Sequence, residues 1–202
     1  IYNNNADNNQ GGGVYTLGIN TDIINCTFSN NTSDGHGAGF YMQNSSSVIS
    51  NCTFFNNISD QSGGAFHVQS MDSVFVLSCH VYNNTANNNA GFFINSFDYA
   101  NLDSLNVHNN FGETNTGGAS ANSGEKIFVS NSIFFQNIAD DGNGGGLLLD
   151  NIEYMNINDC VFSENICETS GGGLFVGGQN SNDFIDIITV SYTHLTLPTM
   201  FE

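Results

Sequence analysis

A two-part motif that recurs seven times is the feature that most constrains this chain. Its first part is an apolar residue followed three positions later by asparagine (F-x-x-N), and the apolar residues are Ile1, Phe28, Phe54, Val81, Val107, Phe134 and Phe162. The asparagines are Asn4, Asn31, Asn57, Asn84, Asn110, Asn137 and Asn165. The second part is a run of small residues before an apolar one: GGGV to Val14, GAGF to Phe40, GGAF to Phe66, NAGF to Phe92, GGAS to Ser120, GGGL to Leu147 and GGGL to Leu174. Because both parts stay in phase, one structural unit is repeated.

Aligning the repeats reveals three columns before the F-x-x-N residue. Five positions before it stand Ile23, Ile49, Val76, Leu102, Val129 and Ile157. Two positions before it stand Cys26, Cys52, Cys79, Leu105, Ser132 and Cys160. Between them stand Asn25, Asn51, Ser78, Ser104, Asn131 and Asp159. This odd spacing does not fit one flat strand, whose side chains alternate with period two, and it predicts two short strands joined by a bend.

The fold that these columns predict is all-β. Apolar residues alternate after the second motif, as at Phe40 and Met42, and no helical periodicity is present. We predict a right-handed parallel β-helix of about seven coils of roughly 27 residues, with the seven motif asparagines stacked as a ladder at one corner. Residues 1–189 would form a single β-helix fragment without end caps. A leucine-rich-repeat horseshoe has a similar period, but its leucine and asparagine spacing is absent.

Charge excludes several classes of partner. The chain of 202 residues holds 19 acidic residues against the single Lys126, which gives a formal net charge of −18. Such a surface excludes binding to nucleic acid or to anionic lipid. No run approaches the roughly 18 apolar residues of a membrane-spanning helix, so no membrane insertion is expected from this segment.

The two motifs together resemble the repeat of the polymorphic outer membrane proteins, which are long surface passengers of an autotransporter type. The resemblance covers residues 1 to about 189, although NAGF lacks the first glycine and GGAS places serine at the strand start. It implies an extracellular or cell-surface location, at the outer membrane if the source is bacterial. It also implies a role in adhesion.

The last segment departs from the repeat. Residues 190–199, VSYTHLTLPT, resemble a translated adapter from sequencing-library preparation, and Thr193 stands where the next motif asparagine is due. We therefore predict that residues 190–202 are an adapter-derived artefact tail. A natural C-terminal cap is the alternative.

Candidate chemical groups have plain structural interpretations. The stacked cysteines are expected to pack as small hydrophobes, with a disulfide or a metal as the alternative. His36, His67, His80 and His108 share no column and are expected in solvent. Loop acids such as Asp34, Asp60, Asp140 and Glu168 offer oxygen ligands for calcium, but the nonapeptide of calcium-binding β-rolls is absent. We expect no catalytic residues, no metal and no cofactor.

The candidate binding site is an outward column after the second motif. It contains Tyr15, Tyr41, His67, Phe93, Leu148 and Phe175, where a solvated strand would carry polar groups, with Ala121 completing the column. We call these six residues the aromatic stripe. A contiguous exposed apolar stripe often marks an interaction face. The alternative is that the rings support one another or lie beneath a turn.

The favoured function is therefore a non-catalytic, surface-exposed or secreted passenger that binds a host or cell-surface protein or a glycan, or associates laterally with its own kind. A non-catalytic part of a polysaccharide-acting β-helix enzyme is one alternative. A structural spacer is the other.

Overall fold

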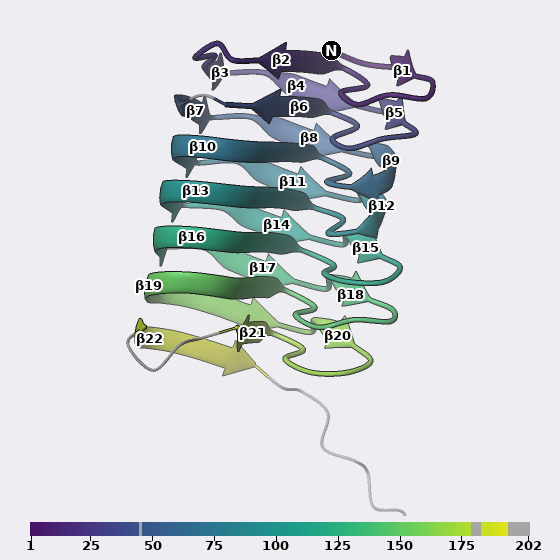
Figure 1. Cartoon of the computed structure of the whole chain (residues 1–202). Helices are drawn as coiled ribbons and strands as arrows, with labels where there is room; N and C mark the ends of the chain where they lie inside the picture. The colour runs from purple at the N-terminus through teal and green to yellow at the C-terminus, as the bar shows by residue number, and fades with distance from the viewer. Residues whose placement is uncertain (45, 179–182, 194–202) are drawn as a thin grey trace, which may run out of the picture.

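The computed structural model describes residues 1–44, 46–178 and 183–193, and these residues form a right-handed parallel β-helix (Figure 1). In Figure 1 the near strands run to the left and the far strands to the right as the chain descends from its N-terminus. Seen from the N-terminal end, the coils therefore turn clockwise as they recede. The described residues contain parallel sheets and no helix, hence no helix that could cross a membrane. The predicted fold class is confirmed.

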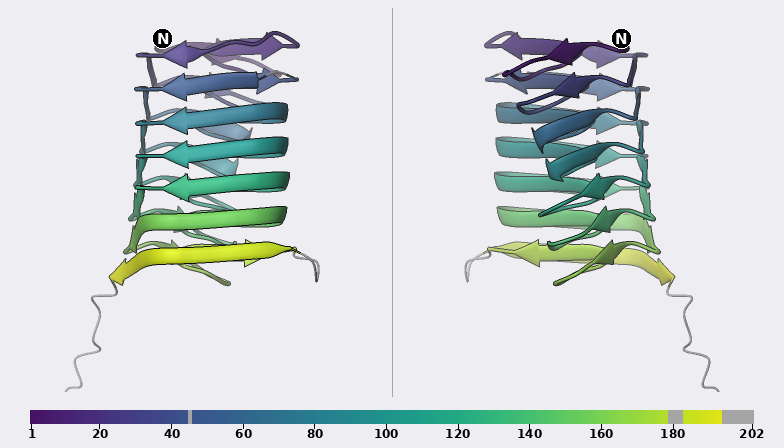
Figure 2. Two further views of the ribbon diagram at one scale, coloured as in Figure 1. Left: turned by 90° about the vertical axis from the view of Figure 1, so that its left-hand side faces the viewer. Right: turned by 90° about the vertical axis from the view of Figure 1, so that its right-hand side faces the viewer.

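One face of the rod is a sheet of very short strands, which we call the short-strand sheet. Among the described residues it has seven strands, paired in parallel in chain order. They are β1 (Asn5–Ala6), β5 (Thr32–Ser33), β9 (Ile58–Ser62), β12 (Thr85–Asn88), β15 (Phe111–Gly112), β18 (Ile138–Ala139) and β20 (Ile166–Cys167). Figure 1 shows them stacked along the right-hand side, and Figure 2 shows the same stack from two further sides.

The remaining strands form a second sheet that wraps round the other faces, which we call the wrapping sheet. Its near strands begin after the small-residue motif: β2 (Val14–Leu17), β6 (Phe40–Gln43), β10 (Phe66–Leu77), β13 (Phe92–Asp103), β16 (Ala119–Ser130), β19 (Leu147–Ser163) and β21 (Leu174–Gly177). Beside them lie β3 (Ile23–Ile24), β7 (Ser46–Ser50) and β22 (Phe184–Thr193). The far strands are β4 (Thr27–Ser29), β8 (Thr53–Phe55), β11 (His80–Tyr82), β14 (Asn106–His108) and β17 (Ile133–Phe135). In the middle coils, segments expected as separate strands are continuous around one corner.

Strand register places equivalent residues of successive coils directly over one another. Phe66 pairs with Phe40 above it and with Phe92 below it, and Val76 pairs with Ile49 and Leu102. One predicted alignment is wrong: Ala119, and not Ser120, pairs with Phe92 and Leu147. The motif of that coil therefore reads TGGA, which moves Ser120 into the outward column and Ala121 into the core.

Phenylalanine ladders fill the interior. Phe40, Phe66 and Phe92 are fully buried and stack with ring centroids 4.8 and 4.7 Å apart. Phe28 and Phe54 stack in a second column at 5.1 Å. Such pairs add to the burial of apolar area, so each coil is stabilised chiefly by its neighbours.

Left-handed backbone turns the chain at the corners. Asn51, between β7 and β8, has φ 53°, and Ser78 in the next coil has φ 52°. Aligned positive φ values recur in three columns: Asn25, Asn51, Ser78, Ser104, Asn131 and Asp159; Asn30, Asn56, Asn83, Asn109, Gln136 and Glu164; and Asn44, Ser70, Ser96, Ser123 and Asn151. Asparagine tolerates this conformation better than most residues, which explains its abundance. The expected bend is confirmed.

The described part of the coil continues beyond residue 189. Strand β22 runs from Phe184 to Thr193, and Val190 pairs with Cys160 in the coil above. The strand therefore shows no break at the predicted boundary. Residues 194–202, which make up most of the predicted adapter-derived tail, lie outside the described residues.

Candidate interaction surfaces

The motif asparagines line one corner of the interior. Asn31 Nδ2 donates to Asn57 Oδ1 at 2.9 Å, and Asn57 Nδ2 donates to Asn84 Oδ1 at 2.9 Å. The same oxygen of Asn84 accepts the backbone N–H of Asn57 at 3.0 Å. This chain of amide bonds runs from Asn4 to Asn165. These side chains are committed to each other and to backbone, so they satisfy buried polar groups and are not available to a ligand.

The cysteine side chains also make hydrogen bonds to backbone groups, here at the bend before the F-x-x-N motif. Cys52 Sγ accepts the backbone N–H of Cys26 at 3.4 Å and donates to the Ser50 carbonyl at 3.2 Å. Ser132 Oγ holds the same place in its coil, where it accepts the N–H of Leu105 at 3.0 Å. The hydrogen bond with Cys52, together with burial, raises the pKa of Cys79. All five cysteines are free thiols.

The aromatic stripe is not the exposed surface that strand alternation predicted. Tyr41, His67 and Leu148 are only 3%, 2% and 7% exposed. Phe93 and Phe175 are half-buried, and only Tyr15 is largely open to solvent. His36, on the loop that precedes β6, packs against Tyr41 and His67 with ring centroids 6.3 and 4.7 Å away. The loop covers the outer side of the strand, so the rings form a second, external core.

His67 is the member of this external core whose buried polar atoms are not satisfied. Neither ring nitrogen has a hydrogen-bond partner, and the ring lies among Tyr41, Phe93 and His36. Burial, with a smaller effect of nearby His36, lowers the pKa of His67 to about 3. The expectation that the histidines are solvated is therefore wrong for His67, whereas His36 is half-buried. Nevertheless, no group of three or more His, Cys, Asp or Glu side chains in the described part of the chain could hold a metal ion.

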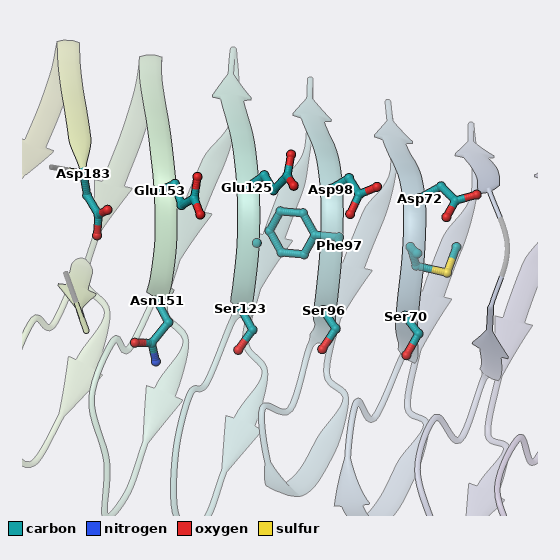
Figure 3. Close-up of a pocket in the computed structure, with 12 residues that line it drawn as sticks. Ser70, Asp72, Ser96, Phe97, Asp98, Ser123, Glu125, Asn151, Glu153 and Asp183 are labelled. Carbon is teal, nitrogen blue, oxygen red and sulfur yellow. The ribbon is translucent and has the colours of Figure 1, made fainter. Parts of the chain in front are cut away.

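A groove of about 560 Å³ follows one corner of the wrapping sheet (Figure 3). Figure 3 shows a row of acids along one side of it: Asp72, Asp98, Glu125, Glu153 and Asp183. The other side carries Ser70, Ser96, Ser123 and Asn151, whose backbones are left-handed. The Phe97 ring leans over Gly124, where a Cβ would overlap it. Sequence analysis singled out the loop acids and not this row.

The short-strand sheet bears an exposed column that sequence analysis missed. Register stacks Thr32, Ile58, Thr85, Phe111, Ile138 and Ile166, which we call the outer column. Ile58, Phe111 and Ile166 are 48%, 36% and 59% exposed. Two positions further on, in most coils just past the end of the strand, lies the acidic column, whose members are all exposed: Asp7, Asp34, Asp60, Asn87, Glu113, Asp140 and Glu168. The signal was available, because each outer-column residue directly follows a motif asparagine.

Comparison with known proteins bears on the repeat itself. The family model of the Chlamydia polymorphic membrane protein repeat matches residues 25–43 and 51–69. The chain carries repeats of the polymorphic membrane protein type. Each matched stretch runs from the left-handed bend before the F-x-x-N motif, through the asparagine ladder and the small-residue motif, to the near strand β6 or β10. No curated protein and no solved structure matches the chain.

The matched stretches also hold the beginnings of both exposed columns. Thr32 with Asp34, and Ile58 with Asp60, fall within them. The other described coils repeat the same geometry, because the register places equivalent residues at each level.

Proposed function

We propose that this chain is a non-catalytic rod in a surface-exposed repeat protein, and that its outward faces mediate adhesion. The observation that carries the proposal is the match to the polymorphic membrane protein repeat in two stretches whose fold is the same as that of the other coils. Aligned coils display identical positions at a constant spacing of about 4.8 Å, which creates long surfaces for contact.

The charge limits which partners these faces can bind. With 19 acids and one lysine, the rod repels anionic surfaces and anionic polymers and favours cationic ones. The asparagines, the cysteines and most of the aromatic stripe are occupied in holding the coils together, so recognition falls to the exposed columns.

The test is adhesion of beads that carry the full 202-residue chain to cultured epithelial cells. We expect several times more attached beads than with albumin-coated beads of equal charge density. Cells treated with protease and cells treated with glycosidases form two further arms, which separate a protein receptor from a glycan receptor. Equal attachment of chain-coated and albumin-coated beads in all arms would support the spacer function instead.

A further inference from the structure

In the short-strand sheet the outward side chains of the outer column are larger than the inward side chains beside them, which is the reverse of the usual arrangement. Its outward residues include Ile58, Phe111, Ile138 and Ile166, whereas the inward residues of the same strands are Ser59, Gly112, Ala139 and Cys167. Small inward residues are required because loops pack against them: Ser59 Oγ donates to the Gly35 carbonyl at 2.7 Å. The large apolar side chains are therefore the ones that face solvent.

The fold does not require those outward residues to be apolar. Thr32 and Thr85 occupy the same column and pair in the same register as their neighbours. Threonine suits a solvated strand as well as isoleucine does, since both are β-branched. An exposed apolar row at positions where the fold accepts threonine points to contact with another molecule.

Charge and shape define what that molecule must carry. The acidic column lies beside the outer column, with Asp60, Glu113, Asp140 and Glu168 all exposed. At the last coils, a hollow of about 330 Å³ is lined by Ile138, Ile166 and Cys167 and rimmed by Asp140 and Glu168. A second copy of this chain would bring no matching cations, because Lys126 is its single basic residue besides histidine.

We propose that the outer and acidic columns together form a docking surface for a partner protein segment whose row of apolar side chains is flanked by a row of lysine or arginine. The inference rests on the proposed adhesive function and names the face and the partner chemistry. Apolar burial along the outer column would supply affinity. Charge pairing along the acidic column would supply orientation and a faster association rate.

The probe is a synthetic amphipathic helix of about 18 residues, with a leucine stripe flanked on one side by lysine. Two matched peptides replace lysine by glutamate or leucine by serine. We expect the full chain to bind the leucine and lysine peptide at least tenfold more tightly than either matched peptide, as measured by fluorescence anisotropy at 150 mM salt.

Variants of the full chain locate the contact. Ile58→Thr, Phe111→Thr and Ile166→Thr together should weaken binding at least tenfold, and Ile166→Thr alone should weaken it measurably. Ile133→Thr is the matched control, because Ile133 is 43% exposed on a far strand and Thr53 already stands in its column. We expect the control to change the dissociation constant by less than twofold.

The acidic column has its own control. Asp60→Asn, Glu113→Gln and Asp140→Asn together should weaken binding and flatten its dependence on salt. Asp98→Asn, Glu125→Gln and Glu153→Gln neutralise three acids of the groove in Figure 3 and should leave binding unchanged.

Three results would overturn the proposal. They are equal binding of all three peptides, equal loss in Ile133→Thr and in the triple threonine variant, and a triple variant that alters self-association in sedimentation without altering peptide binding. The last result would assign the face to a second copy. The bead assay distinguishes the two proposals. If beads with the wild-type chain and beads with the triple threonine variant attach equally to cells, adhesion stands and this docking surface is ruled out. If the chain binds the peptide but its beads do not attach to cells, the docking surface stands and adhesion is ruled out.

Discussion

At the residue scale, one buried imidazole connects folding to acidity. In the folded chain, neither ring nitrogen of His67 has a hydrogen-bond partner and the ring is buried, so the neutral imidazole is favoured there. Its pKa of about 3 lies below the ordinary value of about 6.5 expected in the unfolded chain. Between these values the unfolded state takes up a proton and the folded state does not. Stability contributed by neutral His67 is therefore present above about pH 6.5 and lost as the pH falls toward 3.

We expect the free energy of unfolding to fall by about 2 kcal/mol between pH 7 and pH 5 through this residue. His67→Phe keeps an aromatic ring between Tyr41 and Phe93 and should remove that part of the pH dependence. Urea unfolding at the two pH values measures it, with exposed His80→Phe as the control. A His67→Phe protein with the pH dependence of the wild type would show that the imidazole is not the cause.

A substitution in the asparagine ladder should lower the free energy of unfolding by more than the change at His67. Asn84 donates to Asn110 Oδ1 and to the Phe54 and Tyr82 carbonyls, and it accepts from both nitrogens of Asn57. Asn84→Ala takes one hydrogen-bond partner from each of two buried nitrogens of Asn57 and from the buried Phe54 carbonyl, so we expect a loss of about 3 kcal/mol or more. The exposed Asn87→Ala should cost less than about 0.5 kcal/mol. Equal urea midpoints for the two variants would contradict a ladder that stabilises the corner.

At the element scale, coils are interchangeable because the strands of the wrapping sheet place equivalent residues over one another from coil to coil. Deleting residues 66–91 joins Ala65 to Phe92, two residues that already follow one another in phase. The shortened chain should keep its β-type circular dichroism, and its urea m-value should drop by roughly one part in seven, in proportion to the buried area.

The matched control deletes residues 66–90, which is one residue fewer and shifts the coil that begins at Phe92 by one position against the coil above it. That protein should lose cooperative unfolding, since a one-residue shift exchanges inward and outward side chains at the junction. If the two deletions behave alike, register does not determine the stability of the coil.

Most of the fold could be predicted from the sequence because residues that lie one repeat apart in the sequence lie in contact in the stacked coils. The phase of Phe28, Phe54 and Val81 was sufficient to predict columns, bends and the inward faces. The position of the aromatic stripe relative to solvent could not be predicted in the same way. Alternation correctly gave Tyr41 and His67 an outward direction, but it carries no information about a loop that folds back over the strand.

The short-strand face escaped prediction for a related reason. Strands of two residues, such as β15 and β20, are too short to show alternation, so Phe111 and Ile166 had no apparent phase. Aligning the residues one position after the motif asparagine reveals the apolar outer column. The acids three positions after it, such as Asp34 and Asp60, are evident from the sequence as loop acids, but not as neighbours of an apolar row.

At the scale of the whole molecule, like charges are stacked at the coil spacing along two edges of the rod. The row from Asp72 to Asp183 and the acidic column of the short-strand sheet both lack cationic side chains within them. Their mutual repulsion opposes folding, and salt weakens it as the Debye length falls from about 30 Å at 0.01 M to about 10 Å at 0.1 M.

We expect the thermal midpoint to rise by several degrees between 10 and 300 mM sodium chloride. Choline chloride of equal ionic strength should give the same rise, because screening does not depend on the identity of the cation. Differential scanning calorimetry measures both. If the thermal midpoint falls with either salt, or stays constant with both, repulsion within the acidic rows does not significantly destabilise the fold.

The left-handed corners also limit how such a rod can vary. Glycine, asparagine and aspartate suit a positive φ best and β-branched residues worst, and the three corner columns hold no β-branched residue, so substitutions at Asn51 or Ser78 are restricted. Positions between the corners carry no such restriction. Copies of this coil can therefore diverge in the surface they display while keeping one backbone path, which lets a single frame acquire unrelated binding specificities by changing its faces alone.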